Sequence, residues 1–558
     1  MRRESVRMLD GVWDFAVVGN FFDADVLSGG FNEKIRVPFC PESALSGIGR
    51  KEFFTHCKYR RRFRLHKEAG TRWLLHFGAV DYEAAVYVNG TFVCRHIGGY
   101  TPFSADITDA LREGRNELTV LVHDDVRTDS ASGKQTDRAE SYGCYYTRVT
   151  GIWQSVWLER VPEFYIRSVH FAPDASASAV CIRAEMAGKG TLHAQIFYRG
   201  RCVGEGSTAV EHRTALTVPL SEVHPWGVGR GELYDVRLTF GEDAVESYFG
   251  IRTFECRGNA FYLNGMPVFL RLVLDQGYDK EGIYTTPNRG RMGKRIRMAQ
   301  ALGFHGARLH QKIFEPAFLY ECDRRGYLVW EEYPSWGTDF YSADRVGDVF
   351  NEWREAMERD MDHPSVIVWC PANESWNDAY RGCSYVRECS SEYLRLLYAF
   401  TVAVDASRPC LTSSGGIHTD TDIYDFHDYG SAERLREVLA CLSETGELPC
   451  PFLAPRGEQP CYGGQPVICS EYGGRTLCAK EGWGYARAED ADAWMDEICA
   501  MTRTLMESDV CAGLCYTQLY DVEQEQNGLY TYDNTPKFTK EQGKRLRAVL
   551  RRRASIEK

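Results

Sequence analysis

The chain has 558 residues, more than one hydrophobic core holds, so we expect about two to four domains. Hydrophobic residues make up 44% of the chain and aromatic residues 13%, enough to fill several cores. The formal net charge of -12 disfavours binding to nucleic acid or to an anionic membrane, because both require basic surfaces. We therefore expect neither partner.

The first residues, MRRESVRMLDGVWDF, contain charges but lack the apolar core of a secretory signal. No stretch approaches the about 18 apolar residues of a membrane span. The 20 cysteines are scattered without a C-x-x-C pair, which is typical of a reducing compartment, and we expect a cytoplasmic protein. Because paired Cys and His ligand spacing is missing, no metal site is predicted, and no cofactor is predicted either.

Short β-rich runs separated by turn residues, such as KYRRRFRL, RWLLHFGAV, NELTVLVH and SVWLERV, extend to about residue 160. The run VYVNGTFVC places Asn89-Gly90 between two alternating segments, which predicts a hairpin. From about residue 164 to residue 253, runs such as YIRSVHFAP, AVCIRAEM and LYDVRLTF recur at the spacing of a second, smaller sandwich. Both segments are therefore predicted to be β domains.

After Phe254, strand-like and helix-like segments alternate. The predicted strands are MPVFLRLVLD, FHGARLH, YLVWEE, SVIVWCPANE, CLTSS, IYDFHDY, PVICSEYGG and AGLCYTQLYD. Helices are expected through GKRIRMAQAL, through PAFLYECDRR up to Gly326, from Asp348 as a cap, and across Cys389 to Val404. Eight strands with interleaved helices predict a (β/α)8 barrel, in which irregular linkers follow the fifth and sixth strands.

The segment HPSVIVWCPANESWN, residues 363–377, changes character at Pro371. Its apolar run predicts a buried parallel strand, the fourth of the barrel, and Glu374 follows that strand. In this fold, the loops after the strands carry the catalytic residues. Glu374 is therefore predicted to be catalytic rather than a solvated loop residue.

A second glutamate, Glu471, follows the seventh predicted strand in PVICSEYGG. Strands four and seven are not neighbours, so we expect the two carboxylates to face each other across the barrel mouth. Hydrolysis of a glycosidic bond needs two such carboxyl groups, one protonated and one ionised. Arg308, at the end of the second strand, is positioned to keep Glu471 ionised. From spacing alone, two ordinary loop glutamates remain the alternative.

Further residues at the same predicted rim are candidates for substrate binding: Asn373, Asp275, Arg308, His310, His427, Tyr429, Trp376, Gln518 and Glu525. We interpret His310 and His427 as hydrogen-bonding residues rather than metal ligands, because the chain has no His-x-His pair. Glu331 and Glu332 are adjacent at the end of the third strand, so at most one of them faces the barrel interior.

Several motifs occur in order along nearly the whole chain. The first segment contains LLHFGAVDYEAAVYVNG and TGIWQSVWLE, the second HPWGVGRGELYDV and YFGIRTFE, and the third GYLVWEE, HPSVIVWCPANES and VICSEYGG. Together they resemble glycoside hydrolase family 2, which includes β-galactosidases, β-glucuronidases and β-mannosidases. The resemblance implies a jelly-roll β-sandwich over residues 1–162, an immunoglobulin-like β-sandwich over 163–253 and a catalytic TIM barrel over 254–558.

The resemblance also implies hydrolysis with retention by double displacement, in which Glu374 is the acid/base and Glu471 the nucleophile. β-Glucuronidases carry an Asn-x-Lys after the eighth strand that binds the uronate carboxylate, whereas EQEQNGLYTYD contains no cation. Asp521, Glu523 and Glu525 in this stretch would repel a uronic acid. We therefore expect an exo-glycosidase that acts on a neutral β-linked sugar, with a β-galactoside first.

Two alternatives stay open. One is a β-glucuronidase or another specificity of the same family. The other is a carbohydrate-binding protein without catalysis, which the presence of both Glu374 and Glu471 disfavours. The expected partner is a small carbohydrate or glycoside, and the sequence also allows a homo-oligomer.

Overall fold

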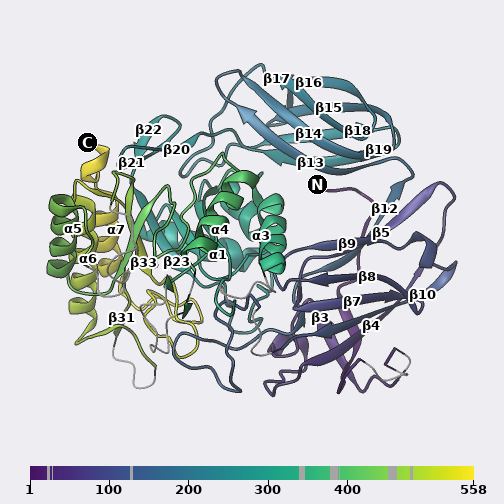
Figure 1. Ribbon diagram of the computed structural model, residues 1–558, viewed down its shortest axis with the longest axis horizontal. Helices are drawn as coiled ribbons and strands as arrows, with labels where there is room; N and C mark the ends of the chain where they lie inside the picture. Colours follow the sequence, from purple (N-terminus) through teal and green to yellow (C-terminus); the bar gives the residue numbers. More distant parts are fainter. Residues whose placement is uncertain are drawn as a thin grey trace.

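The computed structural model describes residues 1–21, 26–27, 29–125, 130–338, 346–376, 387–388, 390–449, 462–477 and 482–558. Figure 1 shows a β-rich first part on the right, a smaller β-sandwich at the top and an α/β part on the left. This arrangement confirms the predicted fold class of two β-sandwiches and a TIM barrel. The predicted boundaries after residues 162 and 253 fall between strands, and we propose them as the domain limits.

The first domain has two antiparallel sheets around one apolar core that includes Trp13, Phe15 and Tyr59. The strand order is β1-β12-β5-β9 in one sheet and β3-β2-β4-β10-β7-β8 in the other, and β11 pairs with β6. The strands are β1 (Val6–Met8), β2 (Gly11–Val17), β3 (Glu33–Val37), β4 (His56–Leu65), β5 (Thr71–Phe77), β6 (Val80–Asp81), β7 (Glu83–Val88), β8 (Thr91–Ile97), β9 (Phe103–Asp106), β10 (Gly114–His123), β11 (Gly151–Ile152) and β12 (Val156–Pro162).

The predicted hairpin at Asn89-Gly90 is confirmed. Strands β7 and β8 pair up to Val88 and Thr91, so that the turn contains only Asn89 and Gly90. Their φ angles of 52° and 82° are left-handed, as a type I′ turn requires, and Asn and Gly adopt such angles readily.

The second domain is a sandwich of a three-stranded sheet, β13-β14-β17, and a four-stranded sheet, β16-β15-β18-β19. Its strands are β13 (Tyr165–Asp174), β14 (Ala179–Ala187), β15 (Gly190–Tyr198), β16 (Arg201–Val210), β17 (Arg213–Pro219), β18 (Tyr234–Phe240) and β19 (Asp243–Phe249). The sequence pattern does not predict β16, which contains Gly204 and Gly206. Gly204 is needed for close packing, because an added Cβ would lie 2.6 Å from the carbonyl oxygen of Pro219.

The third domain begins with a small antiparallel sheet of β20 (Phe254–Arg257), β21 (Ala260–Leu263) and β22 (Met266–Val268). A parallel sheet follows in the order β26-β25-β24-β23-β33-β30-β29. Its strands are β23 (Leu270–Asp275), β24 (Gly306–Leu309), β25 (Leu328–Glu332), β26 (Val366–Cys370), β29 (Tyr424–Asp428), β30 (Val467–Gly473) and β33 (Cys511–Thr517). All seven coincide with predicted barrel strands, although the first predicted strand is divided between β22 and β23.

The fifth predicted strand, CLTSS at residues 410–414, is not a regular strand. It forms isolated parallel bridges to the β26 side, between Trp369 and Cys410 and between Asn373 and Ser414. On its other side, the backbone N–H of Gly415 donates to Asp425 in β29 over 3.0 Å. This segment therefore lies between the two outer strands of the parallel sheet and closes the barrel.

The helices are α1 (Arg289–Leu302), α2 (Pro316–Asp323), α3 (Val346–Asp360), α4 (Ser391–Val404), α5 (Ala432–Thr445), α6 (Ala491–Glu507) and α7 (Lys540–Leu550). The short strands β27 (Ser375–Trp376), β28 (Arg387–Glu388), β31 (Arg475–Leu477) and β32 (Ala486–Ala488) lie in loops. Asp348 does not cap α3, because the helix already includes Val346, and Cys389 lies outside the described residues. Within the described ranges, no helix combines the length and apolarity needed to cross a membrane.

The first domain and the barrel share one apolar core. This cluster joins Tyr100, Tyr146 and Trp153 of the first domain to barrel residues such as Tyr278 and Tyr284. The ring of Trp153 packs edge-on against Tyr284 at 5.3 Å between centroids. The first domain therefore packs against the barrel through a shared apolar core, and its loops can reach the barrel mouth.

Candidate active site

Glu374 lies just after β26, at the carboxyl end of the barrel strands. Its backbone has a left-handed φ of 47°, and its N–H donates to the carbonyl oxygen of Ser414 over 2.8 Å. Its side chain is 28% exposed, and its Oε1 lies 2.8 Å from Nδ1 of His427. Among the described residues, His427 is the only hydrogen-bond partner of this carboxyl group. A carboxyl group that is reachable from solvent and touches a titratable ring is suited to proton transfer.

Glu471 lies within β30 and is almost completely buried. Arg308 donates to its Oε1 over 3.0 Å, and the hydroxyl of Tyr429 donates to its Oε2 over 2.6 Å. Burial opposes ionisation, but the charges of His427, Arg308, His310 and Lys134 outweigh it and lower the pKa of Glu471 to about 2. This carboxylate is therefore ionised and held in one orientation.

Arg308 connects several residues of the site through its guanidinium. Its guanidinium is completely buried and contacts Glu332 at 2.6 Å, the side-chain oxygen of Asn373 at 2.6 Å and the carbonyl oxygen of Ser470 at 3.1 Å. As predicted, only one glutamate of the adjacent pair faces inward, and Glu332 forms an ion pair with Arg308. Glu331 instead interacts with Asp360, which lies outside the sheet. Burial and the like charge of Asp360 raise the pKa of Glu331 well above its ordinary value.

His427 lies between the two glutamates. Its Nδ1 contacts Glu374, and its Nε2 lies 3.6 Å from Oε1 of Glu471. Burial alone would lower the pKa of His427, but the charge of Glu471 and the bond to Glu374 raise it above the ordinary value. Ligand-type atoms of Glu374, His427 and Glu471 lie within 4.8 Å of one another, a spacing that would also suit a cation. Arg308 already supplies positive charge at Glu471.

A hydrogen-bonded chain of side chains extends from β33 towards the first domain. Gln518 donates to Asn527 over 2.8 Å, and Asn527 donates to Glu525 over 3.0 Å. The hydroxyl of Tyr146, from the first domain, donates to the other oxygen of Glu525. Within the described chain, the buried Oε1 of Gln518 and Nδ2 of Asn373 have no hydrogen-bond partner, so they remain available to hydroxyl groups of a ligand.

The remaining predicted residues are placed as follows. Asp275 is engaged by the hydroxyl of Tyr520 at 2.7 Å and by the N–H of Gly277, and His310 lies 4.0 Å from Oε1 of Glu471. The side chain of Trp376, at the end of β27, lies outside the described residues. The structure thus brings Glu374, Glu471, Asn373, Arg308, His310, His427 and Tyr429 into one cluster and connects Gln518 to Glu525 beside it.

Two of the three acidic residues expected at the mouth are engaged elsewhere. Asp521 pairs with Lys537 at 2.8 Å, and Glu523 accepts the N–H of Thr147 at 3.1 Å. Glu525 also accepts hydrogen bonds, from Tyr146 and Asn527, but of the three acids it is the one that belongs to the chain of side chains beside the two glutamates.

Sequence reasoning missed the residues that support this cluster from other loops. Tyr485 stacks on Tyr429 with 3.4 Å between ring centroids, and Asp425 accepts hydrogen bonds from Ser414 and Ser470. Lys134 and Tyr146 come from the first domain. No sequence spacing relates these residues to the two glutamates, because the packing of separate loops brings them together.

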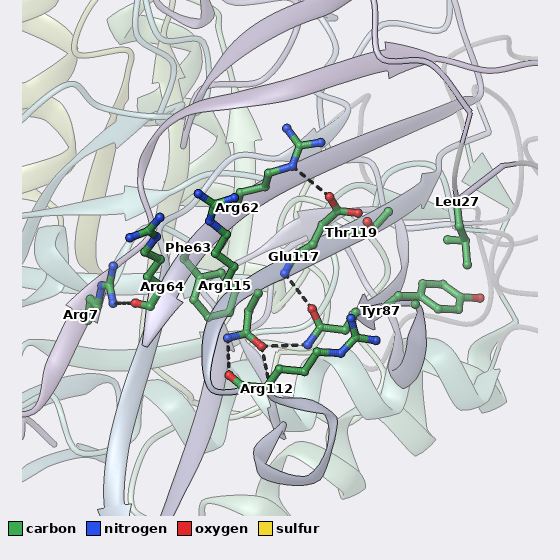
Figure 2. Close-up of a pocket in the computed structure, with 13 residues that line it drawn as sticks. Arg7, Leu27, Arg62, Phe63, Arg64, Tyr87, Arg112, Arg115, Glu117 and Thr119 are labelled. Carbon is green, nitrogen blue, oxygen red and sulfur yellow. Dashed lines mark hydrogen bonds and ion pairs between the residues drawn. The ribbon is translucent and has the colours of Figure 1, made fainter. Parts of the chain in front are cut away.

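An open pocket of about 920 Å³ lies elsewhere, on the outer face of the first domain. Figure 2 shows that exposed arginines line it, among them Arg62, Arg64, Arg112 and Arg115. Glu117 pairs with Arg62 at 3.1 Å. Neither Glu374 nor Glu471 borders this pocket, so we do not assign it to the catalytic site.

Comparison with known proteins agrees with this arrangement. Residues 42–159 match the family model of the glycosyl hydrolase 2 galactose-binding domain-like unit, and residues 314–495 match that of the glycosyl hydrolases family 2 TIM barrel domain. The structure of a β-glucuronidase from Bifidobacterium dentium has a TM-score of 0.81 at 20% identity and covers 99% of this chain and 98% of that chain. A β-galacturonidase from Eisenbergiella tayi has a TM-score of 0.75 at 18% identity, with 98% and 96% covered. Both share the fold.

Curated relatives have more than one specificity. A β-galactosidase from Thermoanaerobacter pseudethanolicus is 29% identical in an alignment of 354 positions that covers 57% of this chain and 45% of that protein. A β-glucuronidase from Felis catus is 25% identical in an alignment of 467 positions that covers 74% of this chain and 66% of that protein. The chain thus spans less than two thirds of the length of either relative. The two matching domain models, in the order seen in the structure, identify the chain as a member of glycoside hydrolase family 2.

Proposed function

We propose that the protein is a retaining β-glycosidase that cleaves a terminal sugar by double displacement. The observation that carries this proposal is the asymmetry of the two glutamates. Glu471 is buried and ionised, and it is fixed by Arg308 and Tyr429, whereas Glu374 is partly exposed and contacts His427. One carboxylate oxygen of Glu374 lies within 4.8 Å of one carboxylate oxygen of Glu471, which suits the separation of about 5–5.5 Å of retaining sites better than the longer one of inverting sites.

In the first step, the Glu471 carboxylate attacks the anomeric carbon while the protonated carboxyl group of Glu374 gives its proton to the departing glycosidic oxygen. The bond between the sugar and its aglycone breaks, and a glycosyl ester on Glu471 forms. In the second step, Glu374 takes a proton from water, the water oxygen attacks the anomeric carbon, and the ester bond to Glu471 breaks. The sugar leaves with its original configuration.

Neighbouring groups support this division of roles. Arg308 and Tyr429 stabilise the negative charge that Glu471 carries before attack and regains on release. His427 bridges the two glutamates and is suited to adjust the proton on Glu374. Nδ2 of Asn373, which has no hydrogen-bond partner among the described residues, is available to a hydroxyl of the sugar next to the anomeric carbon.

For the substrate we propose a neutral β-linked glycoside, with a β-galactoside first. Residues 523–533, which follow β33, contain Glu525 and no lysine or arginine, and this favours hydroxyl groups over a carboxylate. A β-glucuronide is the second candidate, because β-glucuronidases are among the relatives. We further propose a small glycoside as the only ligand required and no cofactor, and we propose the cytoplasm as the compartment.

The experiment is a panel of nitrophenyl β-glycosides, with wild type compared with Glu471→Ala. We expect release of nitrophenol from the β-galactoside faster than from the β-glucuronide, and almost none from Glu471→Ala. NMR should show the β-anomer as the first product. If wild type releases nothing from any glycoside, the protein is a carbohydrate-binding protein instead; if the first product is inverted, the double displacement is wrong.

A further inference from the structure

Lys134 is a largely buried residue of the first domain whose ammonium lies against an aromatic ring of the barrel. The residue as a whole is 6% exposed. Its ammonium lies 5.4 Å from the ring centroid of Trp336 and 5.9 Å from that of Tyr146. Among the described residues it forms no hydrogen bond and no ion pair. The ammonium is not sealed from solvent, so its three donors are accessible to a ligand.

The loop that carries Lys134 is fixed to the barrel. The N–H groups of Ser132 and Gly133 donate to the carbonyl oxygen of Trp336 over 2.8 and 2.9 Å. Gly133 has a φ of 55°, and a Cβ there would lie 2.2 Å from the carbonyl oxygen of Gln311. Gly337 allows the same close approach from the barrel side, where a Cβ would lie 2.2 Å from Oγ of Ser132. Lys134 is therefore held in place before any substrate binds.

Trp336 connects this cation to the catalytic residues, because its indole N–H donates to the carbonyl oxygen of Asn373 over 3.2 Å. Burial would lower the pKa of Lys134, but Glu525, Cys144, Glu471 and Glu374 raise it above the ordinary value, with Glu525 the strongest of them. The lysine is thus charged. Of the neighbouring charged groups, Glu525 raises the pKa of Lys134 most, although the two residues do not form a direct ion pair.

We propose that Lys134 and Glu525 together bind one hydroxyl group of the sugar, and that Glu525 within this pair disfavours uronic acids. This inference rests on the proposed glycosidase function. A hydroxyl oxygen accepts a hydrogen bond from the ammonium, and its proton is donated to the carboxylate, so that one group satisfies both residues. A uronate carboxylate has no proton to donate and would be repelled by Glu525.

The test compares Lys134→Met with wild type on a nitrophenyl β-galactoside and on its 3-, 4- and 6-deoxy derivatives. A hydrogen bond to a charged group is worth about 10- to 100-fold, and we expect this loss in kcat/KM for Lys134→Met on the parent sugar. With wild type, one deoxy derivative should show a similar loss in kcat/KM relative to the parent sugar. On that derivative, Lys134→Met should lower kcat/KM by less than about a further threefold relative to wild type. The matched control is Lys280→Met, which removes an exposed lysine paired with Asp533 and should change nothing.

Two results would overturn the proposal. Equal losses on the parent and on every deoxy derivative would mean that Lys134 does not bind a hydroxyl. A loss confined to the β-glucuronide would mean that Lys134 binds a carboxylate. Lys134→Gln repeats the test if Lys134→Met folds poorly, which its melting temperature reports.

Failure of the glycosidase function is recognised separately, because wild type would then cleave none of these substrates. In that case, calorimetry with galactose and its deoxy forms tests the same hydroxyl contact by affinity alone. Tighter binding of galactose than of one deoxy form, lost in Lys134→Met, would support the contact. Equal binding of galactose and of all three deoxy forms by wild type would overturn it.

Discussion

At the scale of single residues, the site depends on two glutamates in different surroundings. Both come at the end of a buried apolar run, Glu374 just after β26 and Glu471 near the end of β30, and the sequence indicates them for that reason. What the sequence does not indicate is how each is held, because the groups that hold them come from different strands and loops. Arg308 binds Glu471 across 163 positions of sequence, and His427 reaches Glu374 across 53 positions. These contacts exist only once the barrel has closed.

The role of Glu374 predicts a dependence on the leaving group. Glu374→Gln cannot donate a proton, so cleavage of substrates with poor leaving groups should slow by about 10²–10⁴-fold, while nitrophenyl glycosides should lose much less. Steady-state rates on a series of aryl and alkyl glycosides of one sugar measure this. The isosteric variant Glu331→Gln, which alters a glutamate outside the cluster, serves as the control. Equal slowing across the series would contradict the assignment.

The low pKa of Glu471 predicts how stability depends on pH. The folded pKa is about 2, below the ordinary 4.5, so ionised Glu471 stabilises the fold above about pH 4.5, and this contribution is lost as the pH falls towards about 2. The melting temperature of wild type should therefore exceed that of Glu471→Gln most above pH 5, and the difference should shrink by pH 3. A difference that does not change with pH would show that Glu471 is not held ionised by its neighbours.

At the scale of elements, the barrel strands with continuous β-branched and aromatic runs are those the sequence predicts correctly. Such runs are buried on both faces, so their composition directly reflects their environment. Residues 410–415 differ, because the carbonyl oxygen of Ser414 accepts from the N–H of Glu374 and the N–H of Gly415 donates to the side chain of Asp425, in place of a regular ladder. The sequence predicts the place of this segment but not its irregular form.

This segment also positions His427, and that can be tested. Gly415 has a φ of 62°, and a Cβ there would lie 2.3 Å from the ring of His427. Gly415→Ala should therefore displace the ring from between the two glutamates and lower kcat by at least about tenfold. Gly446→Ala is the matched control, because Gly446 has a φ of 73° with no atom nearer than 4.0 Å to its added Cβ. The control should lose about 1 kcal/mol of stability and keep its activity; similar activity in both variants would contradict this role of the segment.

At the scale of the whole molecule, the first domain contributes to the site as well as to the architecture. Each β domain is predictable from its own alternating runs, since that pattern is local. The contact between domains is not predictable, because it depends on glycines such as Gly133 and Gly337 that permit close backbone approach and carry no hydrophobic signal. The role of Tyr146 and Lys134 in the site therefore becomes visible only in the folded chain, where their loop contacts the barrel.

The shared core predicts that the first domain and the barrel unfold together. Trp153 lies in the first domain, is fully buried, and packs against Tyr284 of the barrel. Trp153→Ala should remove about 3–5 kcal/mol of stability and lower the melting temperature of the transition in which catalytic activity is lost. Calorimetry combined with residual activity after heating measures both. Phe240→Ala is the control, because Phe240 lies in the separate core of the second domain. If Trp153→Ala shifts a transition that leaves the activity intact, the two domains unfold independently and the site does not depend on their shared core.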